Sequence, residues 1–331
     1  MTATGGRSTR AALWPVLRAL CSLSALAWVL WRTPLHSIVA ALAHASLPLV
    51  LIGLSLNVLT RLAAAERTQM ICRGLGLRVS RWQNIETLFI SNFYALLSPG
   101  PVLSGAVSVY RYSRFGIPVS DGLSVLLVSR AIEAGAFIAI GAACLWSDRR
   151  VPLAAVREPL WAATALLLLM ALAMILWTRI HGHHRSRAAA EADPVVTTAA
   201  RGRMRSIRAV WHELMKRGPA MAWQAGAPAA VQVLMSGLAL AILARALGVN
   251  LTLISAIWVN AAVYAVVLLP ISIAGVGVRE FTLLNALGLL GVPAQVTVAL
   301  SLLLFADPLI NAMIGGLLQI RSSAHGTRNL A

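Results

Sequence analysis

The sequence predicts an all-α, polytopic membrane protein with about eight spans. Hydrophobic residues make up 59% of the 331 residues and charged residues only 12%, and the mean hydropathy is +0.78. A soluble domain is about 45–50% apolar and about 25% charged, so an ordinary soluble globule is excluded. The 28 basic residues outnumber the 11 acidic ones, and most lie between apolar runs, as in cytoplasmic loops that face anionic lipid headgroups. We therefore expect lipid headgroups, and no nucleic acid, as partners of these loops.

The apolar runs are each long enough to cross a bilayer, which takes about 20 helical residues. The first, residues 11–31, is interrupted by Arg18 and is followed by no small-residue cleavage site at the right distance. An uncleaved span is therefore favoured over a signal peptide. The other runs cover residues 37–60, 121–146, 159–178, 222–246, 252–270 and 297–320, and two weaker segments at 84–112 and 271–292 are broken by proline and glycine.

The charges of the connections predict the topology. Segment 61–82 holds five arginines against Glu66 alone, and 179–221 holds nine basic residues against three acidic ones. Both should be cytoplasmic loops, and the connections 147–158 and 247–251 suit the opposite side. With the first broken segment re-entrant and the second crossing fully, there are eight crossings and both termini are cytoplasmic. The topology of each broken segment changes this count.

The whole chain, 1–331, is interpreted as one transmembrane domain. A basic linker at 179–221 divides it into a first half, about 11–178, and a second half, about 222–320. Cys21, Cys72 and Cys144 have no metal-ligand spacing and are interpreted as small buried hydrophobic residues. His181, His183 and His184 have no carboxylate or cysteine at ligand spacing and are assigned to a solvated linker. We expect no metal and no cofactor.

The two broken segments share a pattern. In the first, Asn92 is followed by Ser98-Pro99-Gly100-Pro101, Ser104-Gly105 and Tyr110-Arg111; in the second, Asn260 is followed by Leu269-Pro270-Ile271-Ser272, Gly275-Val276-Gly277 and Arg279-Glu280. Proline removes a backbone donor, and such breaks at membrane depth are tolerated only inside protein or along a cavity. Paired breaks in two halves are typical of a transporter site built from an inverted internal repeat. The alternative is that common proline kinks pair by chance.

Ionisable residues inside the spans are the next candidates. Arg130 and Glu133 lie three residues apart on one helix face and are expected to pair, either to fix helix packing or to line a path for a polar substrate. Asp307 shares a face with Asn311, and its expected partner is Arg279, Arg130 or Arg111. Gln224, Gln232 and Glu86 are interpreted as interfacial. The candidate cavity residues are Asn92, Pro99, Gly100, Gly105, Arg111, Arg130, Glu133, Pro270, Ser272, Gly275, Gly277, Arg279, Glu280, Asp307 and Asn311.

The sequence carries no Asp-x-Asp, His-Glu-x-x-His, Gly-x-Ser-x-Gly or P-loop motif, so catalysis is unsupported. The segment from Leu269 to Glu280, with Leu290-Gly291-Val292 and Gly315-Gly316-Leu317, resembles the second signature of the lysylphosphatidylglycerol synthase transmembrane, flippase-like family. The residues Asn92, Pro99-Gly100, Gly105, Arg111, Gly116 and Arg130-x-x-Glu133 resemble the first. The resemblance covers roughly residues 15–320.

That resemblance implies a polytopic lipid translocase module, fused in some members to a cytoplasmic aminoacyl-transferase domain. This chain stops after the last span, so we expect the synthase activity to be absent. Pro101 and Ala106 stand where the first signature usually has a basic and an acidic residue, which leaves the substrate and its coupling open.

The leading hypothesis is a polar cavity, formed where the broken segments meet, through which a lipid headgroup crosses between leaflets. Arg111, Arg130 and Arg279 would bind a phosphate. Glu133, Glu280 and Asp307 would balance these arginines or bind a cationic headgroup, so the headgroup charge stays open. The alternatives are a membrane-embedded lipid-modifying enzyme, with Glu280 or Asp307 as general base, and a non-transporting scaffold of a lipid-biosynthesis pathway. We expect a bacterial inner-membrane location, with a homo-oligomer or lipid-biosynthesis enzymes as further partners.

Overall fold

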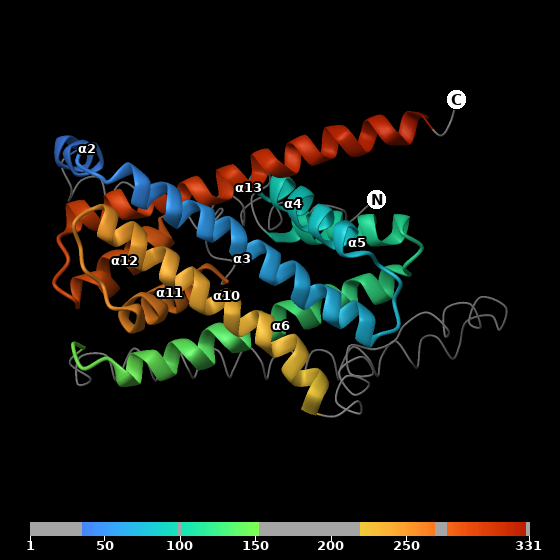
Figure 1. The fold of residues 1–331 in the computed structure, drawn as a ribbon, viewed down its shortest axis with the longest axis horizontal. Coiled ribbons are helices and arrows are strands. Elements are labelled where there is room, and N and C mark those ends of the chain that lie inside the picture. The colour runs from blue at the N-terminus through green and yellow to red at the C-terminus, as the bar shows by residue number, and fades with distance from the viewer. Residues whose placement is uncertain (1–34, 98–100, 152–218, 269–276, 329–331) are drawn as a thin grey trace, which may run out of the picture.

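The computed structural model describes residues 35–97, 101–151, 219–268 and 277–328 (Figure 1). All the regular structure in these ranges is helical, which confirms the all-α prediction. The helices are α2 (Leu35–Ala43), α3 (Leu47–Gly74), α4 (Arg81–Leu97), α5 (Pro101–Arg114), α6 (Val119–Ser147), α10 (Pro219–Ala246), α11 (Leu253–Val267), α12 (Val278–Gly288) and α13 (Ala294–Arg328).

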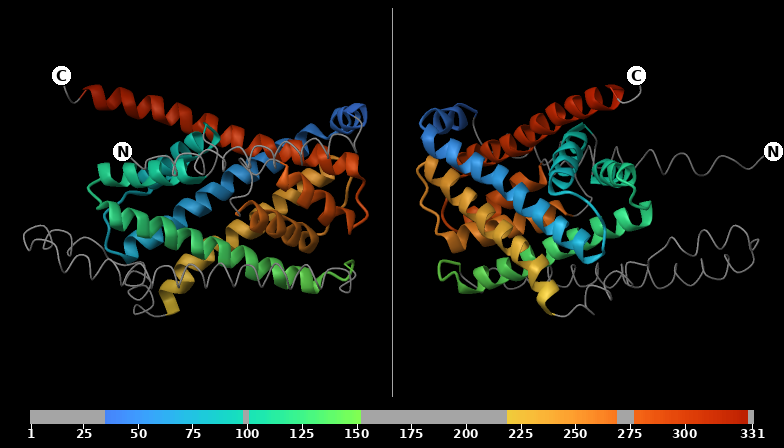
Figure 2. Two further views of the ribbon diagram at one scale, coloured as in Figure 1. Left: turned by 180° about the vertical axis from the view of Figure 1, so that it is seen from behind. Right: turned by 45° about the vertical axis from the view of Figure 1, so that its right-hand side comes forward.

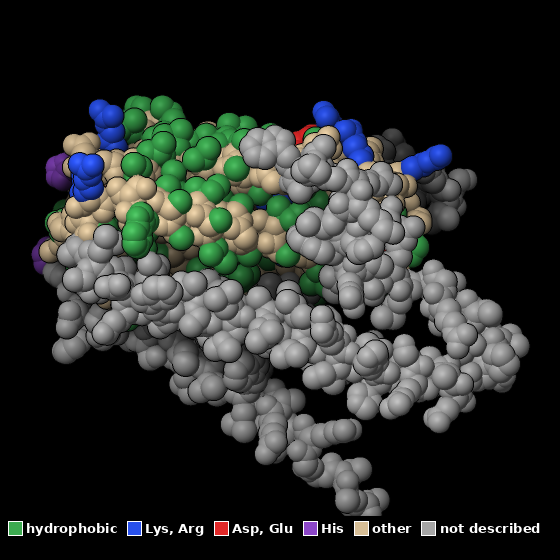
Figure 3. Space-filling model, turned by 90° about the horizontal axis from the view of Figure 1, so that it is seen from below, with side chains coloured by type: hydrophobic (Ala, Val, Ile, Leu, Met, Phe, Trp, Pro, Cys, Tyr) green, Lys and Arg blue, Asp and Glu red, His purple; other side chains and the backbone are tan. Residues whose placement is uncertain are grey.

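Four of these helices, α3, α6, α10 and α13, are long and apolar enough to cross a membrane. The 28 residues of α3 extend roughly 42 Å at 1.5 Å per residue, against a hydrocarbon core of roughly 30 Å. Large apolar side chains such as Met313, Leu317 and Ile320 point outward on α13. Figure 3 shows hydrophobic side chains across the middle of the described surface and basic side chains toward its two ends. This surface suits a multi-pass membrane protein.

The described helices form two halves with the same order of elements. Each half has a long helix, two short helices and a second long helix: α3 to α6 in the first half and α10 to α13 in the second (Figures 1 and 2). The turns that flank the short helices all contain a glycine at positive φ, where a side chain would be strained: Gly76, Gly116, Gly248 and Gly291. In each turn the residue after the glycine donates its N–H to the carbonyl five residues earlier: Leu77 to Cys72, Ile117 to Tyr112, Val249 to Ala244 and Val292 to Leu287.

The two halves run in opposite directions, because their first helices, α3 and α10, are antiparallel. At one end, the Ser46 N–H before α3 donates to the carbonyl of Ala246, the last residue of α10, at 2.9 Å. At the other end, Ala225 in the first turns of α10 packs with Ile71 and Cys72 near the end of α3. An inverted internal repeat is therefore present in the described residues.

The halves also interlock, because the last long helix of each packs on the first short helix of the other. On α13, Gly315 lies against the backbone of Phe89 in α4, and on α6, Gly141 lies against Ala261 in α11. Phe89 and Ala261 each follow their turn glycine, Gly76 or Gly248, by 13 residues. The two contacts therefore occupy equivalent places in the repeat.

The structure corrects three expectations about the spans. Residues 37–60 are not one run, because α2 ends at Ala43 and α3 begins at Leu47. Residues 61–74 belong to α3 and not to a loop. The second broken segment does not cross, because the turn before α11 and the turn after α12 pack against one hydrophobic cluster through Val249 and Val292.

The reason for the last correction is length. The 15 residues of α11 and the 11 of α12 extend roughly 22 Å and 16 Å, too short for either to cross. The first broken segment is the α4–α5 hairpin, and the second forms a hairpin together with the run 252–270 before it, as α11 and α12. The two hairpins lie at opposite ends of the molecule (Figure 2). The runs 11–31 and 159–178 and the linker 179–221 lie outside the described residues, except for the first residues of α10.

Candidate functional site

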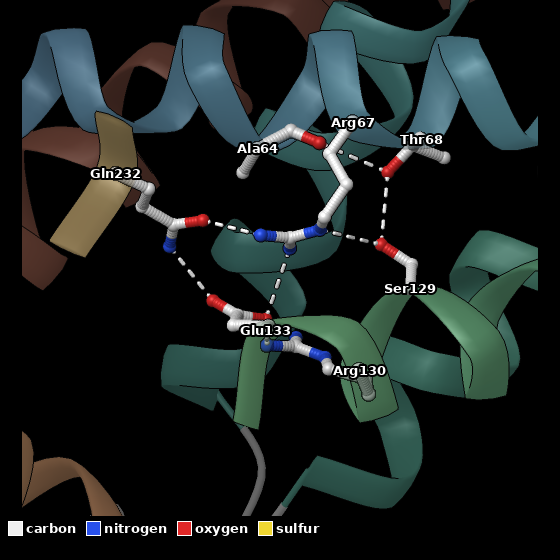
Figure 4. A network of polar contacts seen from close by, with 7 residues as sticks. All are labelled: Ala64, Arg67, Thr68, Ser129, Arg130, Glu133 and Gln232. Carbon is white, nitrogen blue, oxygen red and sulfur yellow. Dashed lines mark hydrogen bonds and ion pairs between the residues drawn. The ribbon is translucent and has the colours of Figure 1, made fainter. Parts of the chain in front are cut away.

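Among the described residues, an extensive buried polar network lies where α3, α6 and α10 meet (Figure 4). Its centre is Arg67 of α3, whose side chain is only 3% exposed. Arg67 Nε donates to Ser129 Oγ at 3.1 Å, and its two terminal nitrogens donate to Gln232 Oε1 at 2.5 Å and to Glu133 Oε2 at 3.1 Å. Gln232 Nε2 in turn donates to Glu133 Oε1 at 2.7 Å. Each of the three nitrogens of the Arg67 guanidinium thus donates a hydrogen bond, which offsets the high free energy of a buried charge.

The sequence did not indicate Arg67, Ser129 or Gln232 as site residues. Arg67 was assigned to a loop, and Gln232 was interpreted as interfacial, which is wrong because it lies buried near the middle of α10. One signal was available, since the apolar pattern of Leu62–Ala65 and of Ile71 continues past Arg61. That pattern is typical of a helix that extends beyond 20 residues.

Arg130 pairs with Glu133, as predicted from their spacing. Its terminal nitrogen donates to Glu133 Oε2 at 3.1 Å, the same oxygen that Arg67 contacts. Unlike Arg67, Arg130 has a side chain that is 53% exposed. Glu133 therefore has two arginine partners, one enclosed and one accessible.

Asp307 of α13 pairs with Arg61 of α3, and not with Arg279, Arg130 or Arg111 as expected. The Arg61 terminal nitrogen lies 2.7 Å from Asp307 Oδ2, and Asn311 Nδ2 donates to Asp307 Oδ1 at 2.7 Å, which confirms their shared face. The partner was missed because Arg61 was placed outside the membrane span. Arg61 is near the middle of α3, so the pair lies within the bundle.

The two acids hold equivalent positions in the repeat. Glu133 lies eight residues before Gly141, and Asp307 lies eight residues before Gly315, and these glycines make the equivalent cross-half contacts. Arg61 also interacts electrostatically with Glu133, so the two sites share one interior region along α3. The bundle thus holds a polar seam, which we define as Arg61, Arg67, Arg130, Glu133, Gln232, Asp307 and Asn311.

Glu280 begins the second short helix of the second hairpin. It accepts hydrogen bonds from the Gly277 N–H at 2.5 Å and from Ser301 Oγ of α13 at 2.7 Å, and Arg279 lies 3.0 Å away. Gly277 has φ +84°, which favours glycine at this cap. Arg279 also lies over the ring of Phe305, 5.4 Å from its centroid. Arg279 and Glu280 thus both contact α13.

The first hairpin holds a different set of contacts. Arg111 of α5 pairs with Glu86 of α4 at 2.8 Å and lies 5.8 Å from the ring centroid of Phe115. The Asn92 amide nitrogen is buried and has no partner in the part of the chain that the structure describes. Gly105 lies beside Leu126 of α6, and its surroundings are apolar.

The structure brings only some of the predicted site residues together. Glu133 and Arg130 are joined in one network, Asp307 and Asn311 in a second, and Arg279, Glu280 and Gly277 in a third. Pro99, Gly100, Pro270, Ser272 and Gly275 lie outside the described residues. Among the residues that are described, no group of three or more His, Cys, Asp or Glu is placed to hold a metal ion.

The profile of the family described as Lysylphosphatidylglycerol synthase TM region matches residues 16–315. The chain belongs to this family. The match spans both halves of the repeat and the whole polar seam, which confirms the resemblance seen in the sequence signatures. No curated protein matches the chain. In this member of the family, the charges of the polar seam lie on the crossing helices α3, α6 and α13, and α10 adds the neutral Gln232, which suits a role with membrane lipids.

Proposed function

We propose that this protein moves a membrane lipid with a polar headgroup between the two leaflets of a bacterial inner membrane. The observation that carries the proposal is the polar seam near the middle of the crossing helices. A headgroup that leaves water loses its hydrogen bonds and needs replacement partners inside the bilayer. Arginine and carboxylate side chains on the crossing helices are such partners.

The inverted hairpins supply the second support. The α4–α5 hairpin enters the bundle from one end and the α11–α12 hairpin from the other, and α3 and α10 run between them. A headgroup would pass from one hairpin to the seam and then to the other hairpin, while its acyl chains stay against the apolar outer surface. Inverted repeats with broken helices are the usual architecture of such alternating paths.

We assign the first hairpin to the cytoplasmic side. The turn between α3 and α4 carries Arg78, and Arg73 and Arg81 flank it, whereas the turn between α10 and α11 holds no charged residue and is flanked by Arg245 alone. Positive charge of this kind marks the cytoplasmic side. Single cysteines at the exposed positions Arg78 and Asn250, in a protein whose three native cysteines are replaced, should react with a membrane-impermeant maleimide from opposite sides of sealed vesicles; labelling from one side would contradict the assignment.

The alternative of a lipid-modifying enzyme has less support. A general base needs an accessible carboxylate, but Glu280 is held by Arg279 and Ser301, and Asp307 by Arg61 and Asn311. A translocase leaves the lipid chemically unchanged. Mass spectrometry of lipids recovered after incubation with the protein therefore separates the two proposals, since a new product would favour the enzyme.

Leaflet exchange in proteoliposomes tests the proposal. A fluorescent phospholipid is quenched from outside with dithionite, and the fraction accessible over time reports exchange. We expect the wild type to exceed empty liposomes and Glu133→Gln to be at least tenfold slower, because the variant loses a carboxylate of the seam. The matched control is Glu66→Gln, whose residue pairs with Arg81 on the surface at 3.3 Å and should keep the wild-type rate. Exchange at the empty-liposome rate by folded protein would reject the proposal.

A further inference from the structure

We infer that Arg130 and Tyr264 bind a phosphate of the substrate headgroup, and that the substrate therefore carries net negative charge. The inference rests on the proposed translocation and names its substrate class. Its basis is a charge imbalance together with a buried hydroxyl that has no acceptor among the described residues, at one place in the bundle.

The charge imbalance is confined to Glu133. Within the described residues, the other interior ion pairs are one arginine to one carboxylate: Arg61 with Asp307, Arg111 with Glu86 and Arg279 with Glu280. Glu133 alone faces two arginines, Arg67 and Arg130. The seam therefore holds one positive charge more than its carboxylates neutralise. In a low-dielectric interior, that excess favours a bound anion.

Arg130 is the arginine that is available to bind it. Arg67 is enclosed, and its donors are used on Ser129, Gln232 and Glu133. Arg130 donates one hydrogen bond to Glu133, and about half of its side chain is exposed. Its remaining guanidinium donors match the geometry of a phosphate, which arginine binds through two parallel hydrogen bonds.

Tyr264 supplies a second donor at the same place. Its hydroxyl is buried beside the Arg130 guanidinium, which can only donate to it, and no acceptor for the hydroxyl proton is present in the described part of the chain. The ring is fixed by stacking on Phe137 at 4.1 Å between centroids with an interplanar angle of 8°. A buried hydroxyl without an acceptor is unfavourable, and a phosphate oxygen held by Arg130 would accept a hydrogen bond from it.

The site joins both halves. Arg130 and Phe137 belong to α6 of the first half, and Tyr264 lies near the end of α11, where the second hairpin breaks. A phosphate bound there would lie between the polar seam and the second hairpin. A zwitterionic headgroup would bring a cation as well, and no additional carboxylate at Arg130 is present among the described residues to neutralise it.

Binding is measured with the full-length protein in a neutral detergent, from the shift of the thermal unfolding midpoint as each probe is added. The probes are phosphatidylglycerol, which is anionic, phosphatidylcholine, which is zwitterionic, monoglucosyl diacylglycerol, which has no phosphate, and soluble glycerol phosphate. We expect phosphatidylglycerol to bind at least tenfold more tightly than the other two lipids. Glycerol phosphate that competes with it would show that the phosphate alone is recognised, from either source.

The variants locate the site. Arg130→Gln should weaken phosphatidylglycerol binding about tenfold, with Arg130→Lys between it and wild type. Tyr264→Phe, which keeps the stacked ring, should weaken binding several-fold and serves if Arg130→Gln does not fold. Arg81→Gln, which removes a surface arginine, should bind as wild type. Equal binding by wild type, Arg130→Gln and Tyr264→Phe would place the lipid on the basic loops and overturn the inference.

Leaflet exchange of the same three lipids separates this inference from the proposed function. Faster exchange of phosphatidylglycerol, lost in Arg130→Gln, supports both. Exchange of phosphatidylcholine or the glucolipid at the same rate leaves translocation standing and overturns the anionic substrate. Binding at Arg130 without exchange of any lipid would overturn translocation and leave an anion site.

Discussion

The two halves of the molecule share their turns and close helix contacts but differ in chemistry at equivalent positions. Gly105 and Glu280 each lie eleven residues before a turn glycine, Gly116 or Gly291, and Leu126 and Ser301 each lie ten residues after it. In the first half the pair is an apolar contact, and in the second it is a hydrogen bond of 2.7 Å. The repeat thus fixes the backbone, and the side chains give each half its own chemistry.

The groove between the last two helices of each half shows the same contrast. In the first half, a cavity of about 600 Å³ opens between α5 and α6, lined by residues that include Gly105, Ala106, Leu123 and Leu126. In the second half, α2 covers the corresponding place, because Ile38 packs with Val298 and Leu284. The apolar helix α2 thus covers the groove of the second half, whereas the groove between α5 and α6 in the first half is open.

The two interior acids, Glu133 and Asp307, also differ in their partners. Glu133 has two arginine partners and a glutamine, whereas Asp307 has Arg61 and Asn311. We therefore expect the two halves to respond unequally to matched substitutions, and the following measurements test that inequality.

The largest effect is expected for the arginine partners of the two acids. Arg67→Ala leaves Glu133, Gln232 and Ser129 without their buried partner and should lower the free energy of unfolding by about 3–5 kcal/mol. Arg61→Ala should lower it by about 1 kcal/mol, because the Arg61 side chain is 31% exposed and solvent screens its pair. Denaturant titration in detergent measures both, and equal losses would contradict the difference between the halves.

The cross-half glycine contacts should give the next effect. Gly315→Ala places a methyl against the Phe89 backbone, whose carbonyl carbon would be 2.6 Å away, and should lower stability by about 3 kcal/mol. Gly141→Ala places a methyl in close contact with the Ala261 Cβ, with the Ala261 Cα 3.8 Å away, and should lower it by about 2 kcal/mol. Adding Ala261→Gly should rescue Gly141→Ala. If truncation of Phe93 raised the stability of Gly315→Ala by a similar amount, the Phe93 side chain, and not the Phe89 backbone, would be the group that the new methyl contacts.

Asp148 at the end of α6 gives a smaller, pH-dependent effect. Burial raises the pKa of Asp148, but hydrogen bonds from Ser255, Trp258 and the Arg150 N–H outweigh burial and hold it below its ordinary value of 3.8. A carboxyl with a depressed pKa stabilises the fold above its unfolded pKa, and that contribution is lost as the pH falls below it. Asp148→Asn should therefore lower the free energy of unfolding by about 2 kcal/mol at pH 7.

The same variant should differ little from wild type once the pH falls through the lowered pKa of the folded state, below 3.8. Its matched control is Ser322→Ala at the equivalent place on α13, where the Ser322 hydroxyl donates to the Gln319 carbonyl at 3.1 Å; stability should be unchanged. A loss for Asp148→Asn that stays constant with pH would show that ionisation of Asp148 is not the cause.

The smallest effect is expected in the second hairpin. Ser301→Ala removes one of the hydrogen bonds to Glu280 and should lower the free energy of unfolding by about 1 kcal/mol. Leu126→Ser at the equivalent place in the first half gains no acceptor, because Gly105 has no side chain. Thermal unfolding of both variants checks this, and a stabilised Leu126→Ser protein would contradict the apolar assignment of the first hairpin.

Sequence patterns predicted the features that depend on local spacing. The all-α membrane fold followed from composition, the Arg130–Glu133 pair from its three-residue separation, and the inverted repeat from the paired Pro/Gly breaks. The partners Arg61 and Arg67 were missed because a span was expected to end after about 20 residues, whereas α3 has 28. Contacts of Asp307 with Arg61 and of Glu133 with Gln232 join distant helices, and no local spacing encodes them.

The prediction that the second broken segment crosses the membrane was wrong because the helices of the second hairpin are short. Residues 252–270 are apolar enough to suggest a span, but α11 ends at Val267 and the chain returns through α12. A short apolar helix that packs inside the protein has the same composition as one that begins a crossing, so composition does not separate a hairpin from a crossing pair.

The central claim is that the polar seam carries a lipid headgroup across the bilayer. The most direct test is the initial rate of leaflet exchange of fluorescent phosphatidylglycerol in proteoliposomes containing wild type, Glu133→Gln or Glu66→Gln at equal protein density. We expect wild type and Glu66→Gln to exchange the lipid well above the rate of empty liposomes, and Glu133→Gln to exchange it at least tenfold more slowly. Equal rates for folded wild type and Glu133→Gln, or no exchange by either, would contradict it.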